Sequence, residues 1–287
     1  CMSIKVIQPG LLSSIQDFGR TGYAQYGVPQ SGVMDRYAAK IANLLVGNTQ
    51  YEAVMETTLM GPTLQFQEEM LVALVGLEAV VTLNDEKLAL LKPFEVKNGD
   101  VLQIKQITKG IRLYLAVNGG FQTEMKLKSR SMYEPITKTS SLQKGDQLHI
   151  AEYRDTKEKT FAHLKYEAEK YASEAIEVYP GPEFDFLTDA MIDKLLQQTF
   201  SISKNNSRMA YQLEEKIENN LKPILTQPVL PGTVQFTPGG NLIILMRDAQ
   251  TTGGYPRIFQ LTEESINLLA QKKQGDAIQF QLKNYER

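Results

Sequence analysis

The stretch Asn98-Gly99-Asp100-Val101-Leu102-Gln103-Ile104 joins a tight turn to a short run of β-branched and apolar residues. The same design, Gly-Asp followed by a short strand-like run, recurs at residues 144–150 and 274–280. Glycine adopts the positive φ that such a turn requires, and the aspartate can hydrogen-bond the backbone of the turn. We interpret all three as structural turns that lead into strands, so their aspartates are not candidate catalytic residues.

Short apolar runs between turn residues continue along most of the chain. The longest run, at residues 70–77, is far too short to span a bilayer. Many short strands with frequent turn signals are typical of barrels and sandwiches. Further runs of this kind lie at residues 80–83, 113–117, 148–150, 176–179, 234–236, 242–246 and 278–282. The sequence therefore predicts a mainly β protein with no membrane span.

A few short helices interrupt this pattern. Apolar residues recur at helical spacing from Tyr37 to Leu45, after Asp35, and Gly47-Asn48 ends the run. A second helix is predicted after Thr262, a residue type that caps helices, and a third over residues 188–196. For Asp35, capping the first helix is a better interpretation than a role in a site.

The chain length of 287 residues fits one large domain or two lobes of about 130–150 residues. Residues 154–174 are highly charged and poor in strand formers, which favours a connection. We therefore predict an N-terminal β-barrel lobe at 1–153, a connection at 154–175 and a C-terminal barrel lobe at 176–287, with lobes that can exchange strands. A weak internal repeat supports two related lobes: Gln, glycines and Gly-Tyr precede a helix near residue 16 and again near residue 250.

Composition excludes several classes of function. Lys and Arg number 31 against 33 Asp and Glu, a net charge of -2, so no basic field for nucleic acid is expected. With two histidines and one cysteine, the chain offers no His-rich or thiolate metal site and no disulfide framework. Cys1 precedes Met2, which we expect to be the natural start, and no signal-peptide pattern follows. These features favour a cytoplasmic location.

The most unusual segment for chemistry is residues 250–257. It follows an apolar strand and contains Gln250, Thr251 and Thr252, then Gly253-Gly254. Glycines let backbone N–H groups approach a ligand, successive N–H groups can form an anion site, and the threonine hydroxyls can bond a carbonyl or carboxylate oxygen. The structural alternative is a β-turn at Gly253-Gly254.

Residues 14–35 form the second candidate segment, rich in glycines and polar groups. Asp17 and Arg20 are near enough in sequence to pair, or Arg20 can grip a substrate carboxylate with its planar fork. The structural alternative is a long ordered loop with a helix cap at Ser31 or Asp35. Two further arginines, Arg130 and Arg208, each lie beside a hydroxyl, and a structural or solvated role is the simpler interpretation for both.

The sequence lacks the common nucleotide and hydrolase signatures. It contains no G-x-x-x-x-G-K-[ST] loop, no G-x-G-x-x-G fingerprint and no G-x-S-x-G elbow. No cofactor is therefore predicted on this chain alone.

Long motifs resemble the allophanate hydrolase subunit 2 family, also called the biotin-dependent carboxyltransferase family or the family of oxoprolinase C subunits. These motifs are Gln16-Asp17-x-Gly19-Arg20-x-Gly22-Tyr23, Gly27-Val28-Pro29-x-Ser31-Gly32-x-Met34-Asp35 and Gln250-Thr251-Thr252-Gly253-Gly254-Tyr255-Pro256. Shorter matches are Ala116-Val117-x-Gly119-Gly120, Ser129-Arg130-Ser131, Gly181-Pro182, Arg208-Met209-x-Tyr211-x-Leu213 and Gly232-Thr233-Val234-Gln235. The resemblance spans nearly the whole chain in the right order.

This resemblance implies two cyclophilin-like β-barrel lobes and a heteromeric enzyme. It implies a hydrolase component, inactive alone, that acts with an A subunit, with a kinase-inhibitor-like B subunit and with ATP and Mg²⁺ to open 5-oxoproline to glutamate. Two alternatives remain: the carboxyltransferase part of a urea carboxylase or allophanate hydrolase-like system, and a regulatory protein that binds a sporulation kinase inhibitor. The chain has no biotinyl-lysine motif of the Ala-Met-Lys-Met type, so biotin would arrive on another protein.

The same resemblance suggests roles for the candidate residues. We assign the substrate carboxylate to Arg20 or Arg208, and the oxyanion donors to the backbone of Gly253 and Gly254 with help from the neighbouring threonines. Asp17 would act as a base or a positioning acid. The remaining candidates are Gln250 as a catalytic residue, and Gln16, Tyr23, Ser31, Arg130, Gln235 and Tyr255 as substrate-binding residues.

The sequence departs from the family pattern at three places. The usual Ala-Asp-Arg before Gln-Thr-Thr is Arg247-Asp248-Ala249, so the arginine has moved. The glycine-rich stretch before Lys144 is replaced by residues 138–141, and the usual Pro-Pro is Thr237-Pro238. These changes affect the expected ligand contacts more than the expected fold.

Overall fold

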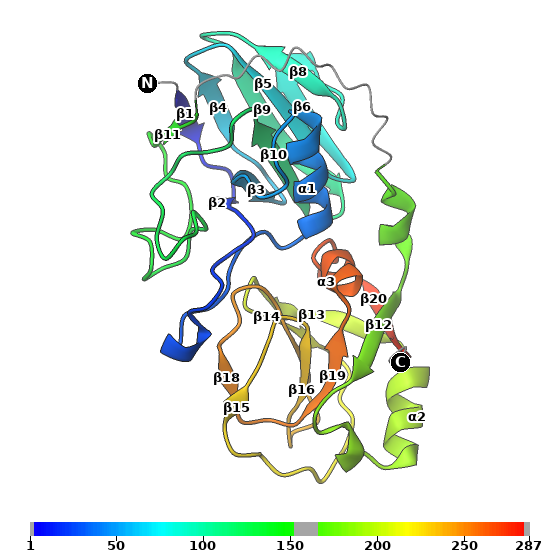
Figure 1. Ribbon diagram of the computed structural model, residues 1–287. Coiled ribbons are helices and arrows are strands. Elements are labelled where there is room, and N and C mark those ends of the chain that lie inside the picture. The colour runs from blue at the N-terminus through cyan, green and yellow to red at the C-terminus, as the bar shows by residue number, and fades with distance from the viewer. Residues whose placement is uncertain (1–2, 152–165, 284–287) are drawn as a thin grey trace. The chain divides into compact units, whose positions relative to one another are not determined.

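The structure, a computed structural model, describes residues 3–151 and 166–283 (Figure 1). Cys1 and residues 154–165 of the predicted connection lie outside the described residues. Within the remainder of that connection, residues 168–172 form a 3-10 helix.

The chain divides into two compact units. Unit 1 comprises Cys1–Arg20 and Ser31–Ala168, and unit 2 comprises Thr21–Gln30 and Glu169–Arg287. The lobe boundaries drawn from the sequence stay a prediction, and each unit is described by itself below.

Unit 1 is built from two sheets whose neighbouring strands are all antiparallel. The six-stranded sheet has the order β11-β1-β4-β9-β6-β7, and the five-stranded sheet has the order β2-β3-β10-β5-β8. The strands of the first sheet are β1 (Ser3–Gln8), β4 (Thr63–Phe66), β6 (Glu78–Leu83), β7 (Glu86–Lys87), β9 (Val101–Lys109) and β11 (Gln147–His149). Those of the second are β2 (Leu12–Gln16), β3 (Val54–Thr58), β5 (Met70–Val75), β8 (Pro93–Val96) and β10 (Arg112–Val117).

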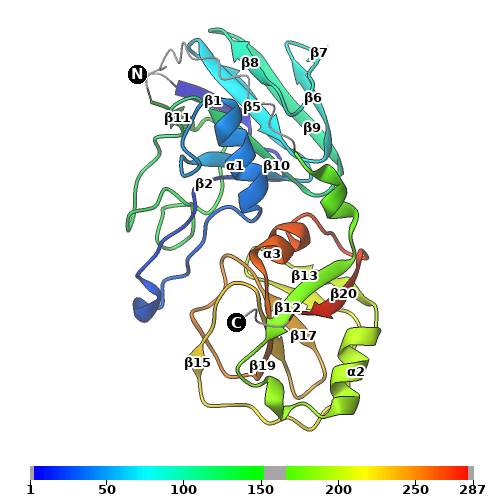
Figure 2. The ribbon, with the colours of Figure 1, turned by 45° about the vertical axis from the view of Figure 1, so that its right-hand side comes forward.

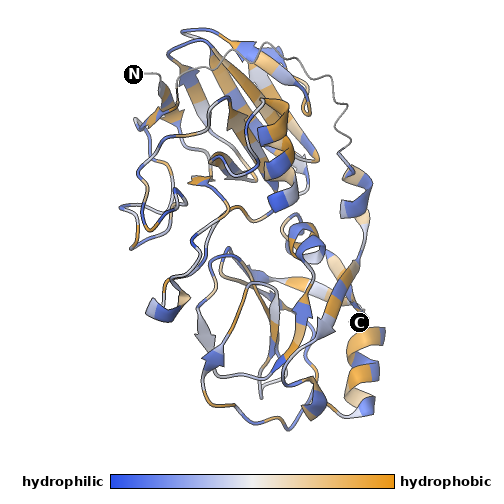
Figure 3. Ribbon diagram, in the orientation of Figure 1, coloured by the Kyte–Doolittle hydropathy of each residue, from blue (hydrophilic) through white to orange (hydrophobic). Residues whose placement is uncertain are grey.

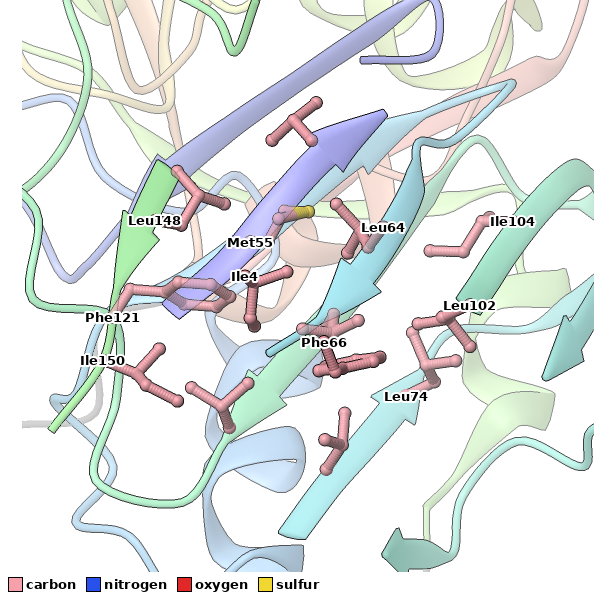
Figure 4. Close-up of a cluster of buried hydrophobic side chains, with 14 of the residues drawn as sticks. Ile4, Met55, Leu64, Phe66, Leu74, Leu102, Ile104, Phe121, Leu148 and Ile150 are labelled. Carbon is pink, nitrogen blue, oxygen red and sulfur yellow. The ribbon is translucent and has the colours of Figure 1, made fainter. Parts of the chain in front are cut away.

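The main core of unit 1 is shared by these two sheets. Ile4, Phe66 and Leu102 come from the six-stranded sheet, and Met55 and Leu74 from the five-stranded sheet (Figure 4). All are buried, and removing their apolar surface from water stabilises the unit at about 25 cal/mol per Å². This core fixes the sheet edges from which the candidate loops emerge.

Helix α1 (Arg36–Leu45) covers the five-stranded sheet of unit 1. The Asp35 carboxylate accepts a hydrogen bond from the backbone N–H of Ala38 at 3.0 Å, so both the predicted helix and its cap are confirmed. Ala38 and Ala42 pack in a second core cluster with Val75 of β5. Figure 3 shows the hydrophobic residues gathered along one side of this helix.

Unit 2 contains a closed barrel with the order β12-β19-β16-β17-β14-β13-β20. Its strands β12 and β20 pair in parallel and lie side by side in Figures 1 and 2, whereas the other neighbours are antiparallel. The barrel strands are β12 (Ala175–Pro180), β13 (Phe200–Asn206), β14 (Ala210–Leu213), β16 (Thr233–Phe236), β17 (Leu242–Leu245), β19 (Arg257–Leu261) and β20 (Ala277–Leu282). The prediction of a mainly β, barrel-containing protein is confirmed.

Short elements complete unit 2. The other two predicted helices are present as α2 (Asp189–Gln197) and α3 (Glu263–Leu269), capped by the side chains of Thr188 and Thr262. A two-stranded ribbon pairs β15 (Gln227–Pro228) with β18 (Thr252–Gly253), outside the barrel ladder. Three 3-10 helices are η1 (Ala24–Tyr26), η2 (Ala168–Ala172) and η3 (Phe184–Phe186).

The three strand-entry turns have the structural role predicted for them. Gly99, Gly145 and Gly275 have φ of 92°, 92° and 85°. In each turn, a carboxylate oxygen of the following aspartate accepts a hydrogen bond from the backbone N–H three residues earlier, at 2.8–2.9 Å. These carboxylates are committed to their own turns, as the sequence indicated.

Candidate functional site

Asp17 lies at the end of β2 and is the centre of a hydrogen-bonded cluster in unit 1. Its Oδ1 accepts from the backbone N–H of Gly19 at 2.8 Å and from the hydroxyls of Ser129 and Ser131 at 2.6 and 2.7 Å. Its Oδ2 accepts from the backbone N–H of Arg130 at 2.7 Å. We call Asp17, Gly19 and Ser129–Ser131 the Asp17 cluster. Four hydrogen bonds join two segments that are more than a hundred residues apart in sequence.

Two neighbours extend this cluster. The buried guanidinium of Arg20 donates through Nη2 to the carbonyl oxygen of Ser131, so Ser131 contacts both Asp17 and Arg20. Buried Gln16 donates through Nε2 to the carbonyl oxygen of Met132 at 3.1 Å. Gln16, Asp17 and Arg20 are therefore brought to one segment, residues 129–132, as a group.

Ser31 and Gly32 pack tightly against the same loop. Ser31 is fully buried with φ of 57°, and its Oγ has no hydrogen-bond partner among the described residues. At Gly32, with φ of 95°, an added Cβ would lie 2.8 Å from the backbone nitrogen of Gly19. Glycine is required there by both the conformation and the close approach. Ser31 does not cap α1, because Asp35 does.

A buried polar network that the sequence did not predict lies beside α1. Glu56 accepts through Oε2 from the backbone N–H of Met34 at 2.7 Å and from the hydroxyl of Tyr114 at 2.9 Å. Its Oε1 lies 3.7 Å from Nε of Arg112. The Tyr114 oxygen also accepts from the backbone N–H of Asp35. Burial raises the pKa of Tyr114 well above its usual value, and the charge of Glu56 adds to this, so the hydroxyl stays protonated.

In unit 2, two glutamines meet between the barrel and the ribbon. Gln250 follows β17 and donates through Nε2 to Oε1 of Gln235 on β16 at 3.4 Å. Gln235 is buried, with 2% of its surface exposed. Nε2 of Gln235 and Oε1 of Gln250 are inaccessible to solvent and have no hydrogen-bond partner among the described residues. We call these two side chains the amide pair.

Gly253 lies directly against this pair. It belongs to strand β18, so the alternative of a β-turn at Gly253-Gly254 is wrong for this residue. Gly253 does not have a positive φ, yet a Cβ added to it would clash with Nε2 of Gln235. Glycine is therefore needed here for close approach, not for an unusual backbone conformation.

The other candidates of this segment lie on or next to the ribbon. The carbonyl oxygen of Thr251 accepts from the backbone N–H of Val229 at 3.0 Å, and that of Gly254 accepts from Ile224 at 2.9 Å. Thr252 is exposed, and Tyr255 has 40% of its surface exposed. The ribbon thus uses backbone groups of this segment for its own pairing.

The arginines near the candidate segments are held by protein groups. Arg208 binds Asp248 through two hydrogen bonds, Nε to Oδ2 at 2.7 Å and Nη2 to Oδ1 at 3.2 Å. Arg130 donates to the carbonyl oxygen of Thr123 and, at 2.5 Å, to Oε1 of Gln122. The structural interpretation of both arginines is supported by these contacts.

The displaced arginine of the Arg247-Asp248-Ala249 stretch has a partner of its own. Arg247 is buried and binds Glu263, the first residue of α3, with both terminal nitrogens. Residue 248 meanwhile supplies the carboxylate for Arg208. The departure from the family pattern is accommodated by two ion pairs within unit 2.

A further ion pair, not predicted from the sequence, ties the end of β12 to β19. Arg257 donates to Glu183 through Nε at 2.8 Å and Nη2 at 2.7 Å, and its backbone N–H donates to the same carboxylate. These hydrogen bonds hold the pKa of Glu183 below its usual value and raise the pKa of Arg257. Nη1 of Arg257 also reaches the carbonyl oxygen of Pro228, which links the ribbon to the barrel.

The predicted site residues thus divide between the units. Residues that fall in unit 1 are Gln16, Asp17, Arg20, Ser31 and Arg130. Those in unit 2 are Tyr23, Arg208, Gln235, Gln250, Thr251, Thr252, Gly253, Gly254 and Tyr255. Within the first set the Asp17 cluster is assembled, and within the second the amide pair is assembled. The prediction that the two sets share one site stays a prediction.

Two features are absent from the described part of the chain. In residues 3–151 and 166–283, no group of three or more His, Cys, Asp or Glu side chains is arranged to hold a metal ion. No helix within those ranges is long and apolar enough to cross a membrane.

Comparison with known proteins defines the class. Residues 26–282 match the family model for the carboxyltransferase domain, subdomain A and B, and the chain belongs to this family. Among individual relatives, it is 33% identical to the C subunit of 5-oxoprolinase from Escherichia coli, over 96% of this chain and 90% of that protein.

Solved structures agree with this assignment. The crystal structure of TTHA0988 superposes with a TM-score of 0.85 at 26% identity, and the match covers 98% of this chain and 56% of that one. The K. lactis urea amidolyase superposes with a TM-score of 0.82 at 28% identity, covering 97% of this chain and 18% of that one. The chain therefore spans about half of one solved relative and a small part of the other.

Proposed function

We propose that this chain is the C subunit of a 5-oxoprolinase complex, which hydrolyses the cyclic amide 5-oxo-L-proline to L-glutamate with ATP. The observation that carries the proposal is length: the similarity covers 90% of the E. coli C subunit but only 18% of the K. lactis urea amidolyase. A chain of matching extent is expected to have the same place in a complex. The name of the E. coli relative, which makes it one lettered subunit of an enzyme, supports partner subunits. We propose that these partners are an A subunit together with a kinase-inhibitor-like B subunit.

ATP, with Mg²⁺, is proposed to bind to the complex and not to this chain by itself. The sequence has no glycine-rich phosphate loop of the known types. The described residues contain no acidic cluster suited to a metal ion. We therefore assign no step at the nucleotide to residues of this chain, and propose that the chain is inactive alone. The cytoplasmic location also stays a prediction.

The proposed work of this chain is to hold the lactam. A lactam is an amide whose resonance opposes ring opening, so its carbonyl oxygen must be activated and oriented. The backbone N–H groups of Gly253 and Gly254, with the hydroxyls of Thr251 and Thr252, are the proposed oxyanion donors. These groups lie in one short segment on and next to β18.

The anchor for the substrate carboxylate is proposed to be Arg20. The alternative, Arg208, would have to give up both of its hydrogen bonds to Asp248. A planar guanidinium suits a carboxylate because it can donate two parallel hydrogen bonds. Arg20 lies next to Ser131, which the Asp17 carboxylate fixes in place.

Asp17 is proposed to be a positioning acid and not the base. Both of its carboxylate oxygens already accept hydrogen bonds from this chain. A general base needs an oxygen within hydrogen-bond reach of the proton that it removes. Asp17 would instead hold the segment that contacts Arg20.

Reconstitution tests the proposed function. Purified A and B subunits are incubated with 5-oxoproline, ATP and Mg²⁺, with and without this chain, and glutamate release is followed. We expect release only when the chain is present and none from the chain alone. Equal release without the chain would contradict the proposal.

A carboxyltransferase activity is the second candidate. It is favoured by the family model, which is that of a carboxyltransferase domain, and by the similarity to urea amidolyase. ATP- and bicarbonate-dependent consumption of urea, with a biotin-carrying partner added, would favour this candidate over 5-oxoproline hydrolysis.

A further inference from the structure

The amide pair leaves two hydrogen-bonding groups unused. A glutamine carboxamide has one carbonyl oxygen and one NH₂ group. The single long bond from Gln250 to Gln235 uses one of each and leaves Nε2 of Gln235 as a donor and Oε1 of Gln250 as an acceptor. Turning both amides over exchanges these roles and again leaves one donor and one acceptor. The remainder does not depend on how the amides are oriented.

Such a remainder is costly in a buried place. Buried polar groups in native proteins almost always have a partner, and those that lack one need an explanation. A nearby glutamine provides a contrast: Gln260 on β19 accepts through Oε1 from the Thr233 hydroxyl at 3.0 Å and donates through Nε2 to the carbonyl oxygen of Pro231 at 2.8 Å. The barrel can therefore satisfy a glutamine completely, and it does not do so at the amide pair.

The unused groups are complementary to a second amide. An amide that presents an N–H and a carbonyl oxygen can donate to Oε1 of Gln250 and accept from Nε2 of Gln235. A lactam and urea both have this arrangement, and the names of the relatives include 5-oxoproline and urea as substrates of those proteins. A carboxylate or an ester lacks the N–H and would leave the Gln250 acceptor without a partner.

The ribbon covers these groups and is lightly attached. Gly253 of β18 lies against Nε2 of Gln235, so a ligand can reach the pair only when the ribbon moves. Each ribbon strand has two residues. Its links to the barrel include the hydrogen bond from Arg257 to Pro228 and the packing of Val229 with Leu245 and Ala249. Short ribbons with few buried contacts are among the first elements to open.

We propose that Gln235 and Gln250 bind the amide group of the substrate, with the β15–β18 ribbon lifting to admit it. Gln250 accepts the ligand N–H and Gln235 donates to the ligand carbonyl oxygen. The assignment rests on the proposed function for the identity of the ligand, a small amide. It makes the pair a determinant of specificity for amides over esters.

The test uses the reconstituted complex and three variants. Gln235→Glu replaces the free donor by an acceptor, and Gln250→Met removes the free acceptor at similar length. Gln260→Glu is the matched control, because both ends of that amide are already satisfied. We expect KM for 5-oxoproline to rise about tenfold or more in each of the first two variants, with a smaller change in kcat, and to stay unchanged in the control.

Equilibrium binding separates this inference from the proposed function. Affinities of the complex for 5-oxoproline, urea, pyrrolidin-2-one and γ-butyrolactone are measured by calorimetry, which needs no turnover. The wild type should prefer the lactam to the lactone about tenfold, and Gln250→Met should abolish the preference. The tighter of 5-oxoproline and urea identifies the natural ligand class.

Several outcomes would overturn the inference. These are wild-type binding of neither amide, unchanged affinities in both variants, or variants that lower the melting temperature alone, as a water-bridged structural pair would. Amide binding that depends on Gln235 and Gln250 without glutamate release would reject the proposed function and retain the amide pair.

Discussion

The Asp17 cluster and the amide pair are both polar groups set against a β scaffold, but they differ in how completely they are satisfied. The Asp17 carboxylate accepts four hydrogen bonds that join two distant segments of unit 1. The amide pair makes one long bond and leaves a donor and an acceptor inside unit 2. Saturated networks rigidify a fold, whereas unsaturated ones carry a cost that a ligand can remove. The comparison separates a structural device from a binding site within one set of sequence motifs.

The largest expected effect concerns the other saturated network, around Glu56. Glu56→Ala removes the acceptor for Met34 and Tyr114 and leaves the buried Arg112 guanidinium without this carboxylate. We expect the free energy of unfolding to fall by about 3–5 kcal/mol, as when one partner of a buried ion pair is removed. Urea unfolding of the full chain measures it. The exposed Glu69→Ala is the control, expected within about 0.5 kcal/mol of the wild type.

A smaller effect is expected where the ribbon meets the amide pair. Gly253→Ala introduces a Cβ that clashes with Nε2 of Gln235, so the free energy of unfolding should fall by about 1–3 kcal/mol. At Gly254 the nearest atom to an added Cβ is the carbonyl oxygen of Ile224, at 3.6 Å. Gly254→Ala should therefore be neutral to within about 0.5 kcal/mol or slightly stabilising. Equal losses in the two variants would mean that the ribbon does not press on the amide pair.

The smallest effect is a pH dependence at the Glu183–Arg257 pair that also ties down the ribbon. Hydrogen bonds from Arg257 lower the pKa of Glu183 below its usual value of 4.5. The stability from this pair is present above the unfolded pKa and is lost as pH falls through the folded pKa. Glu183→Gln should therefore lose less stability than the wild type when pH is lowered from 6 towards 3. Parallel curves in denaturant titrations at each pH would contradict this.

The fold was predictable from the sequence where a local rule decides it. The Gly-Asp turns, the caps at Asp35 and Thr262 and the short strands depend on nearby residues, and the structure confirms them. The sheet order was not predictable, because pairing such as β1 with β11 joins residues far apart in the chain. Local propensity contains no information on which distant edges meet.

The site was predictable only as a set of residues. The motifs identified Asp17, Ser129–Ser131, Gln235 and Gln250, but not that the first two form one cluster and the last two form another. The Glu56 network was missed, because alternation indicated a buried position for Glu56 but gave no partner for it. A charged residue on an apolar strand face was the one signal in the sequence that could have found it.

One measurement tests the central comparison most directly: the free energy of unfolding and KM for 5-oxoproline, determined together for Asp17→Asn and Gln250→Met. Asp17→Asn places an NH₂ group opposite a backbone N–H, so it should lower stability by about 1.5–3 kcal/mol and alter KM little once folded. Gln250→Met should leave stability nearly unchanged and raise KM about tenfold. The reverse pattern, with Asp17→Asn controlling KM and Gln250→Met controlling stability, would contradict the account.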